Sequence, residues 1–177
     1  KSNGTALGTN MVRDINTAFT NASSSPSELT NVNGTLYFRA NDGTNGTELW
    51  KSDGSAAGTV PVTGIDPAVP LINPLGLTNI NGTLFFWAAD NTYGSELWKS
   101  NGTEAGTVLV KDINPGEDGN FIEELTDVDG TLYFRAKDTI HGIELWKSDG
   151  TEEGTVMVSD IWPGEQGSRL DSFGNVN

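Results

Sequence analysis

Glu144-Leu145-Trp146-Lys147-Ser148-Asp149-Gly150-Thr151 is the stretch that decides the fold, because close copies of it begin at Glu48 and Glu96. The tryptophan of each copy follows the previous one by 48 residues in both intervals. A fixed period of roughly 20 to 50 residues is typical of solenoids, propellers and other repeat arrays. We therefore expect the chain of 177 residues to be an array of short units rather than one large core.

A fourth copy of the phrase, Lys1-Ser2-Asn3-Gly4-Thr5, opens the chain without the Glu-Leu-Trp that introduces the others. The expected division is 1–28 as the last strand and connecting loop of a split unit, 29–76, 77–124 and 125–172 as whole units, and 173–177 as the first strand of the next. We expect the last strand of the split unit at 8–15. The split unit would be completed by the remainder of its own polypeptide or by another copy of the chain.

Four short strands, here called a to d, fit into each unit. In the clearest one they are expected at 125–128, 131–136, 144–147 and 155–158, and Asp129-Gly130 between the first two is a hairpin signal. The other units have Asn33-Gly34 and Asn81-Gly82 at that turn. The sequence therefore predicts an all-β fold, a β-propeller of four-stranded antiparallel blades with a 48-residue repeat, comprising three full blades and part of a fourth. The rival is an open β-solenoid, whose coils are typically shorter than these units.

The unit resembles known repeats at two levels. The segment from Leu29 to Gly54, with Tyr37-Phe38 and Leu49-Trp50, resembles a kelch blade, in which an apolar strand, a strand ending in Tyr-x-Phe and a strand with a Leu-Trp-like pair occur in that order. Ala40-Asn41-Asp42 stands where kelch has a diglycine. More closely, the phrase Glu-Leu-Trp-x-x-Asp-Gly-Thr-x-x-Gly-Thr is similar to the bacterial tandem repeat named after it. That resemblance covers nearly the whole chain and implies a secreted or surface-attached repeat protein, without a catalytic residue to transfer.

Composition limits the partners. Ten Lys and Arg against 24 Asp and Glu give a net charge of -14, which argues against binding a nucleic acid backbone. The sequence has no apolar run near the ~18 residues that cross a bilayer, so we expect no membrane insertion. The abundance of Gly, Asn, Asp and Thr is typical of extracellular repeat proteins, and the absence of cysteine excludes disulfides.

Antiparallel order separates two sets of loops. The a–b and c–d turns emerge at one edge of each sheet and are nearly identical in every unit, whereas the b–c and d–a loops emerge at the other edge and vary. Recognition usually lies on variable loops held by a rigid frame, so a glycan or protein ligand is expected at the second edge.

Carboxylates recur six residues apart across each b–c loop. The pairs are Asp42 with Glu48, Asp90 with Glu96, and Asp138 with Glu144. Such oxygen ligands suit Ca²⁺, which is the one cofactor that the sequence suggests. Alternatively, each Asp bonds its own turn and each Glu pairs with a neighbouring Lys or Arg. We favour this second interpretation because the loops lack the dense Asp spacing of a dedicated calcium loop.

Residues that interrupt the repeat are the candidates for contacting a ligand. They are Trp87, Tyr93, Phe121, His141 and Trp162. Their aromatic rings could stack on a sugar or fill gaps between units. The recurring tryptophans at 50, 98 and 146 are instead expected in the interior.

Function is expected to be non-enzymatic. Acids that recur in every unit are poor candidates for a single active site, and the one histidine has no cysteine or second histidine to complete a zinc or nucleophilic site. We expect an extracellular module for binding, adhesion or surface scaffolding. The alternative is a carbohydrate-binding or polysaccharide-acting propeller, since glycoside hydrolysis needs only two acids.

Overall fold

The computed structural model describes residues 1–18, 20, 22–62, 72–90, 92–116, 121–164 and 167–168. In these ranges the chain forms strands and no helix. The strands are β1 (Ser27–Val32), β2 (Thr35–Asn41), β3 (Thr47–Ser52), β4 (Val60–Pro61), β5 (Ile72–Ile80), β6 (Thr83–Asp90), β7 (Gly94–Ser100), β8 (Val108–Lys111), β9 (Ile122–Val128), β10 (Thr131–Asp138), β11 (Gly142–Ser148) and β12 (Val156–Ser159). They pair into three antiparallel sheets of four strands, β1 to β4, β5 to β8 and β9 to β12, which confirms the all-β class.

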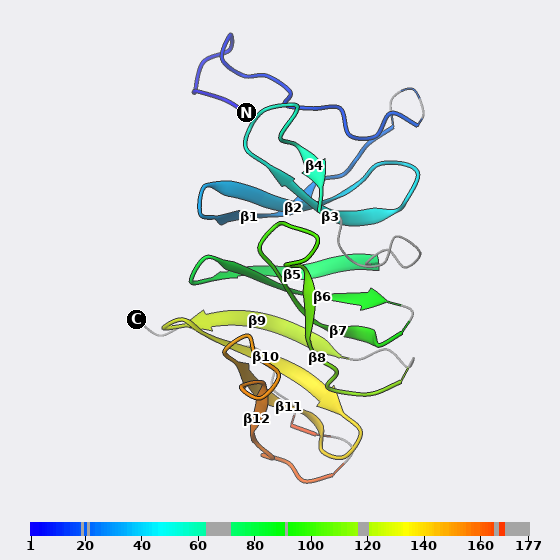
Figure 1. Cartoon of the computed structure of the whole chain (residues 1–177), viewed down its shortest axis with the longest axis vertical. Helices are drawn as coiled ribbons and strands as arrows, with labels where there is room; N and C mark the ends of the chain where they lie inside the picture. Colours follow the sequence, from blue (N-terminus) through cyan, green and yellow to red (C-terminus); the bar gives the residue numbers. More distant parts are fainter. Residues whose placement is uncertain are drawn as a thin grey trace.

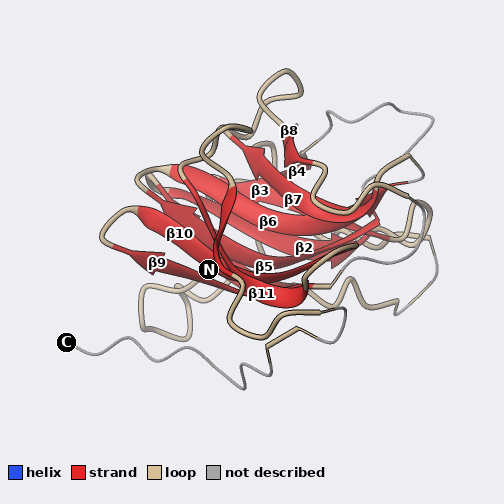
Figure 2. Ribbon diagram, turned by 90° about the horizontal axis from the view of Figure 1, so that it is seen from below, coloured by secondary structure: helices blue, strands red, loops and turns tan. Residues whose placement is uncertain are grey.

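The three sheets are stacked face to face in sequence order, and the N-terminal segment lies over the first sheet (Figure 1). Viewed along the stack, their strands overlie one another (Figure 2). Within the described ranges the stack has two ends. Residues 8–15 form no strand, so our prediction for them is wrong: no third strand of their own unit lies beside them to share a hydrogen-bond ladder. The strand expected in 173–177 lies outside the described residues.

The same local rules set the register in each sheet. At the first hairpin, the φ angles are 51° and 83° for Asn33 and Gly34, 50° and 83° for Asn81 and Gly82, and 51° and 81° for Asp129 and Gly130. Two successive positive φ angles make the type I′ turn that Asn-Gly and Asp-Gly predict. In the next ladder, an alanine stands opposite the Glu of the repeated phrase in every sheet: Ala40 of β2, Ala88 of β6 and Ala136 of β10.

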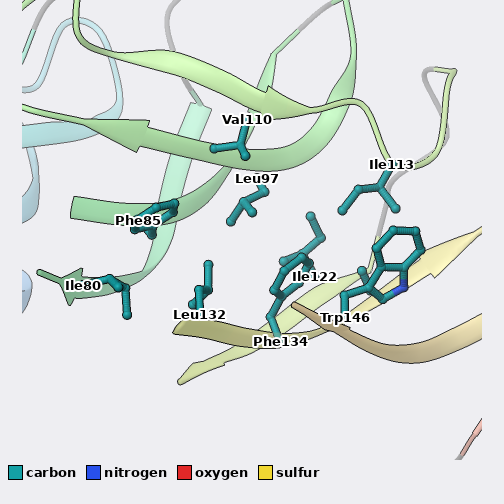
Figure 3. Close-up of a cluster of buried hydrophobic side chains, with 10 residues drawn as sticks. Ile80, Phe85, Leu97, Val110, Ile113, Ile122, Leu132, Phe134 and Trp146 are labelled. Carbon is teal, nitrogen blue, oxygen red and sulfur yellow. The ribbon is translucent and has the colours of Figure 1, made fainter. Parts of the chain in front are cut away.

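Hydrophobic side chains fill the space between neighbouring sheets. Phe85 and Leu97 of the second sheet meet Leu132, Phe134 and Trp146 of the third (Figure 3). The contact between the first and second sheets repeats this pattern with Tyr37, Leu49, Leu84, Phe86 and Trp98.

Each recurring tryptophan packs toward the preceding unit. Trp98 shares a cluster with residues of the first sheet, and Trp146 shares one with residues of the second. Trp50 packs beside Ile15 of the N-terminal segment. The exposed fractions of Trp50, Trp98 and Trp146 are only 3%, 3% and 7%, which confirms the interior position expected of them.

The repeated c–d turn is held by a relay of hydrogen bonds. In the second unit the N–H of Gly102 donates to Ser100 Oγ at 2.9 Å, Ser100 Oγ lies 2.8 Å from Thr107 Oγ1, and Thr107 Oγ1 donates to Thr103 O at 2.8 Å. Since that last bond uses the threonine proton, the serine must donate to the threonine. The same relay is present in the other two units and in the turn of residues 1–9.

Candidate ligand-binding edge

The b–c and d–a loops meet at the edge opposite the repeated turns. Direct backbone bonds join them: Asn41 N to Ser24 O at 2.9 Å, Lys137 N to Phe121 O at 3.0 Å, and Ser168 N to Ile143 O at 2.7 Å. We call this edge the varied edge. Among the described residues it comprises 16–18, 20, 22–26, 41–47, 90, 92–94, 112–116, 121, 138–143, 160–164 and 167–168.

The aspartate of the first predicted Asp–Glu pair closes its own turn. Asp42 Oδ1 accepts the N–H groups of Thr44 and Asn45, and Oδ2 accepts the side-chain amide of Asn45, all at 2.8 Å. Burial acts to raise the pKa of Asp42, but these hydrogen bonds outweigh it and lower the pKa. The carboxylate is therefore already engaged in shaping the loop.

Asp138 likewise closes its own turn in the third unit, and it also contacts His141, the one histidine of the sequence. Its Oδ1 accepts the N–H groups of Ile140 at 2.9 Å and His141 at 2.5 Å, and its Oδ2 lies 2.7 Å from His141 Nδ1. The bond to Asp138 raises the pKa of His141, against the opposing effect of partial burial. His141 occupies the position of Asn45 in the first unit, where the amide makes the equivalent contact with Asp42. His141 therefore closes the turn of the third unit as Asn45 closes that of the first.

The glutamates of the repeated phrase anchor the d–a loops. Glu96 is fully buried, and it accepts the N–H groups of Ile113 at 3.1 Å and Asn114 at 3.2 Å. Glu144 is equally buried and accepts the N–H groups of Ile161, Trp162 and Ser168. These partners are backbone groups of the chain about 17 or more residues further on, where our expectation was a neighbouring Lys or Arg.

Burial also alters the acidity of two of these glutamates. It raises the pKa of Glu96 to about 8, against the effect of the two backbone bonds, and the adjacent Asp112 carboxylate adds to the rise. Glu96 is therefore mostly protonated at neutral pH. Burial likewise raises the pKa of Glu48, and the charge of Asp42 contributes.

As calcium ligands, the Asp–Glu pairs are incomplete within the described part of the chain. No three His, Cys, Asp or Glu side chains gather there as metal ligands would. The side chain of Asp90 lies outside the description. Asp42, Asp138 and Glu144 all accept hydrogen bonds from protein N–H groups.

The aromatic candidates divide by exposure. Trp162 and Tyr93 have exposed fractions of 65% and 38%. Trp87 is half-buried against the cluster between the second and third sheets. Phe121 is half-buried as well, with the guanidinium carbon of Arg135 5.0 Å from its ring centroid. Trp162 and Tyr93 are thus the rings positioned to contact a ligand, whereas Trp87 and Phe121 are used mainly in packing.

Ile140 was missed by the sequence reasoning. Its exposed fraction is 69%, and it lies in the turn beside His141. The other units have Thr44 and Thr92 at this position, so the replacement of a polar by an apolar residue was a visible signal. The varied edge of the third unit therefore presents Ile140, His141 and Trp162, which the repeat does not require.

Among the residues that the structure describes, none belongs to a helix long and apolar enough to cross a membrane. Comparison of the chain with protein-family models, with curated proteins and with solved structures finds no match in any of the three.

Proposed function

We propose that the chain is a non-enzymatic binding or scaffold module that acts outside the cell or at its surface, with the varied edge as its recognition surface. The observation that carries the proposal is that the repeated polar residues and the exposed apolar residues have different roles in the structure. Repeated polar residues such as Asp42, Glu96 and Ser100 are engaged in turns and loop anchors, whereas the exposed Ile140 and Trp162 occur once. Binding sites are commonly built from such irregular loop residues on a regular frame.

The sheets are, in this proposal, consecutive blades of a kelch-like propeller of the bacterial Glu-Leu-Trp-x-x-Asp-Gly-Thr type. The identical register in all three sheets and their stacking in sequence order support it. A propeller buries both faces of each blade against its neighbours, which is how the second sheet is packed here.

Two alternatives remain as hypotheses to test. Calcium could add stability at the Asp–Glu pairs, although the hydrogen bonds of Asp42 and Asp138 favour a structural role for these carboxylates. A polysaccharide-acting enzyme would need two acids that converge on one bond.

A combined screen separates binding from catalysis. The full chain is applied to a glycan array and incubated with a panel of chromogenic glycosides. Retention of a glycan without release of chromophore is the expected result. Hydrolysis of a glycoside, abolished by replacing a varied-edge acid with its amide, would overturn the non-enzymatic proposal.

A further inference from the structure

The outer face of the third sheet exposes side chains whose described counterparts in the other units are buried or packed between sheets. We call this set the end face; it consists of Val128, Tyr133, Leu145, Val158 and Ile161. Val128 has an exposed fraction of 42%, whereas its counterparts Val32 and Ile80 have 4% and 5%. Ile161 has 55% where Ile113 has 7%.

The remaining members of the end face follow the same rule. Val158 is 45% exposed and its counterpart Val110 is 5% exposed. Tyr133 and Leu145 are half-buried, whereas the equivalent Tyr37, Phe85, Leu49 and Leu97 are buried between sheets. The end face therefore presents the kind of apolar surface that the first sheet buries against the second and the second buries against the third.

At the opposite end of the stack, the first sheet also leaves apolar side chains less buried than their counterparts in the other units. Leu29 is 64% exposed, while its counterparts Leu77 and Leu125 pack in the clusters between sheets. Leu36 is half-buried, while Leu84 and Leu132 are fully buried. A hollow of about 280 Å³ lies between this side of the first sheet, at Leu29, Leu36 and Phe38, and the N-terminal segment, at Val12, Arg13 and Ile15. At the equivalent place on the second sheet, side chains of the first sheet fill the space.

We propose that the chain self-associates head to tail, with the end face of one copy packed on the Leu29 side of the first sheet of a second copy. The contact continues the interface already present between the sheets within one chain, and it rests on that interface rather than on the proposed function. Lys147, which is exposed, supports the match. Each of its counterparts donates to a turn carbonyl of the following unit: Lys51 to Gly102 O, and Lys99 to Gly150 O. In the assembly Lys147 would donate to Gly54 O of the second copy.

The N-terminal segment competes with this docking. Arg13 donates to Thr59 O at 2.5 Å and lies over Trp50, with 5.9 Å from its guanidinium carbon to the ring centroid. By repeat equivalence, residues 156–161 of an incoming copy, which begin with β12, would occupy the place of residues 10–15. Residues 10–15 form no strand, whereas β12 is paired with β11. The N-terminal segment is therefore the part that the incoming copy displaces.

Sedimentation of the full chain over a range of concentrations tests the proposal. We expect the mass of the wild type to rise with concentration, and Leu145→Glu and Leu29→Glu each to lose that rise. Val128→Glu should repeat the effect of Leu145→Glu at a more exposed position. The matched control Val108→Glu, at an exposed apolar residue of the second sheet that belongs to neither face, should associate as the wild type does.

Mixing the two defective variants gives the decisive result. Leu145→Glu retains the receiving face and Leu29→Glu retains the end face, so the mixture should form a dimer that neither forms alone. Arg13→Ala, which loosens the competing segment, should tighten association by about threefold. A wild-type mass that stays at 18.8 kDa at all concentrations would overturn the proposal, as would a mixture that remains monomeric or a Leu29→Glu variant that associates normally.

Discussion

Replacing Thr107 by valine tests whether the repeated turn is a buried structural relay. Thr107 is 4% exposed and Ser100 is 1% exposed. Valine keeps the shape of threonine but removes the hydroxyl that accepts from Ser100 Oγ and donates to Thr103 O, both at 2.8 Å. The substitution therefore leaves the Ser100 hydroxyl buried without its acceptor.

The expected cost follows from these contacts. A buried hydroxyl left without a partner costs about 1–3 kcal/mol, and the added methyl group returns at most about 0.8 kcal/mol. We expect Thr107→Val to lower the free energy of unfolding by about 1–2 kcal/mol. The chain supplies its own control, because Thr9 makes the same bonds in the first turn while exposed to solvent. Water can replace those bonds, so Thr9→Val should cost less than about 0.5 kcal/mol.

Urea unfolding of the wild type and both variants measures these changes. The midpoint should shift for Thr107→Val at an unchanged slope, and it should barely move for Thr9→Val. Equal shifts for the two variants, or a Thr107→Val variant as stable as the wild type, would refute the reasoning that burial makes this relay matter.

Three further outcomes follow from the packing and the charges. Leu97→Ala empties a fully buried site between sheets and should lower the free energy of unfolding by about 2–5 kcal/mol. Leu145→Ala on the end face should lower it by less than about 1 kcal/mol when measured at low protein concentration. Similar losses of stability for the two variants would contradict the assignment of interior and end face. Burial raises the pKa of Glu96 to about 8 from 4.5, so the folded state binds the Glu96 proton more tightly than the unfolded state does. The contribution of this group to stability is therefore complete below pH 4.5 and is lost as the pH rises to about 8. Within that window the free energy of unfolding should fall by about 1.4 kcal/mol per pH unit. Glu96→Gln should flatten the profile of unfolding free energy against pH, and a profile that keeps its slope would count against protonated Glu96. If the carboxylates of the b–c loops serve their own turns, EDTA should leave the melting temperature unchanged and calorimetry should detect no calcium uptake, whereas a fall in melting temperature that calcium reverses would favour the calcium hypothesis.

Local sequence rules predicted the unit correctly. Asn33-Gly34 and its counterparts require two positive φ angles, and the constant spacing to Glu-Leu-Trp sets the same register in all three sheets. These features depend on neighbours in the chain, so they can be inferred from residue type alone.

Features that depend on distant neighbours could not be inferred in the same way. Residues 8–15 have the composition of a strand but no partner strand beside them. Glu96 is anchored by backbone groups of a loop that varies in sequence, and backbone donors leave no residue signature. Val128 and Ile80 are equivalent in sequence, yet only the following sheet decides which of them is buried.

The measurement that tests the central claim most directly is the comparison of Trp162→Ala with Leu7→Ala in binding to whichever array glycan the wild type retains. Both side chains are exposed, at 65% and 97%, but Trp162 lies at the varied edge and Leu7 lies in the repeated turn at the opposite edge. We predict that Trp162→Ala weakens binding by about tenfold or more and that Leu7→Ala leaves it unchanged. Binding that survives Trp162→Ala and is lost in Leu7→Ala would contradict the account.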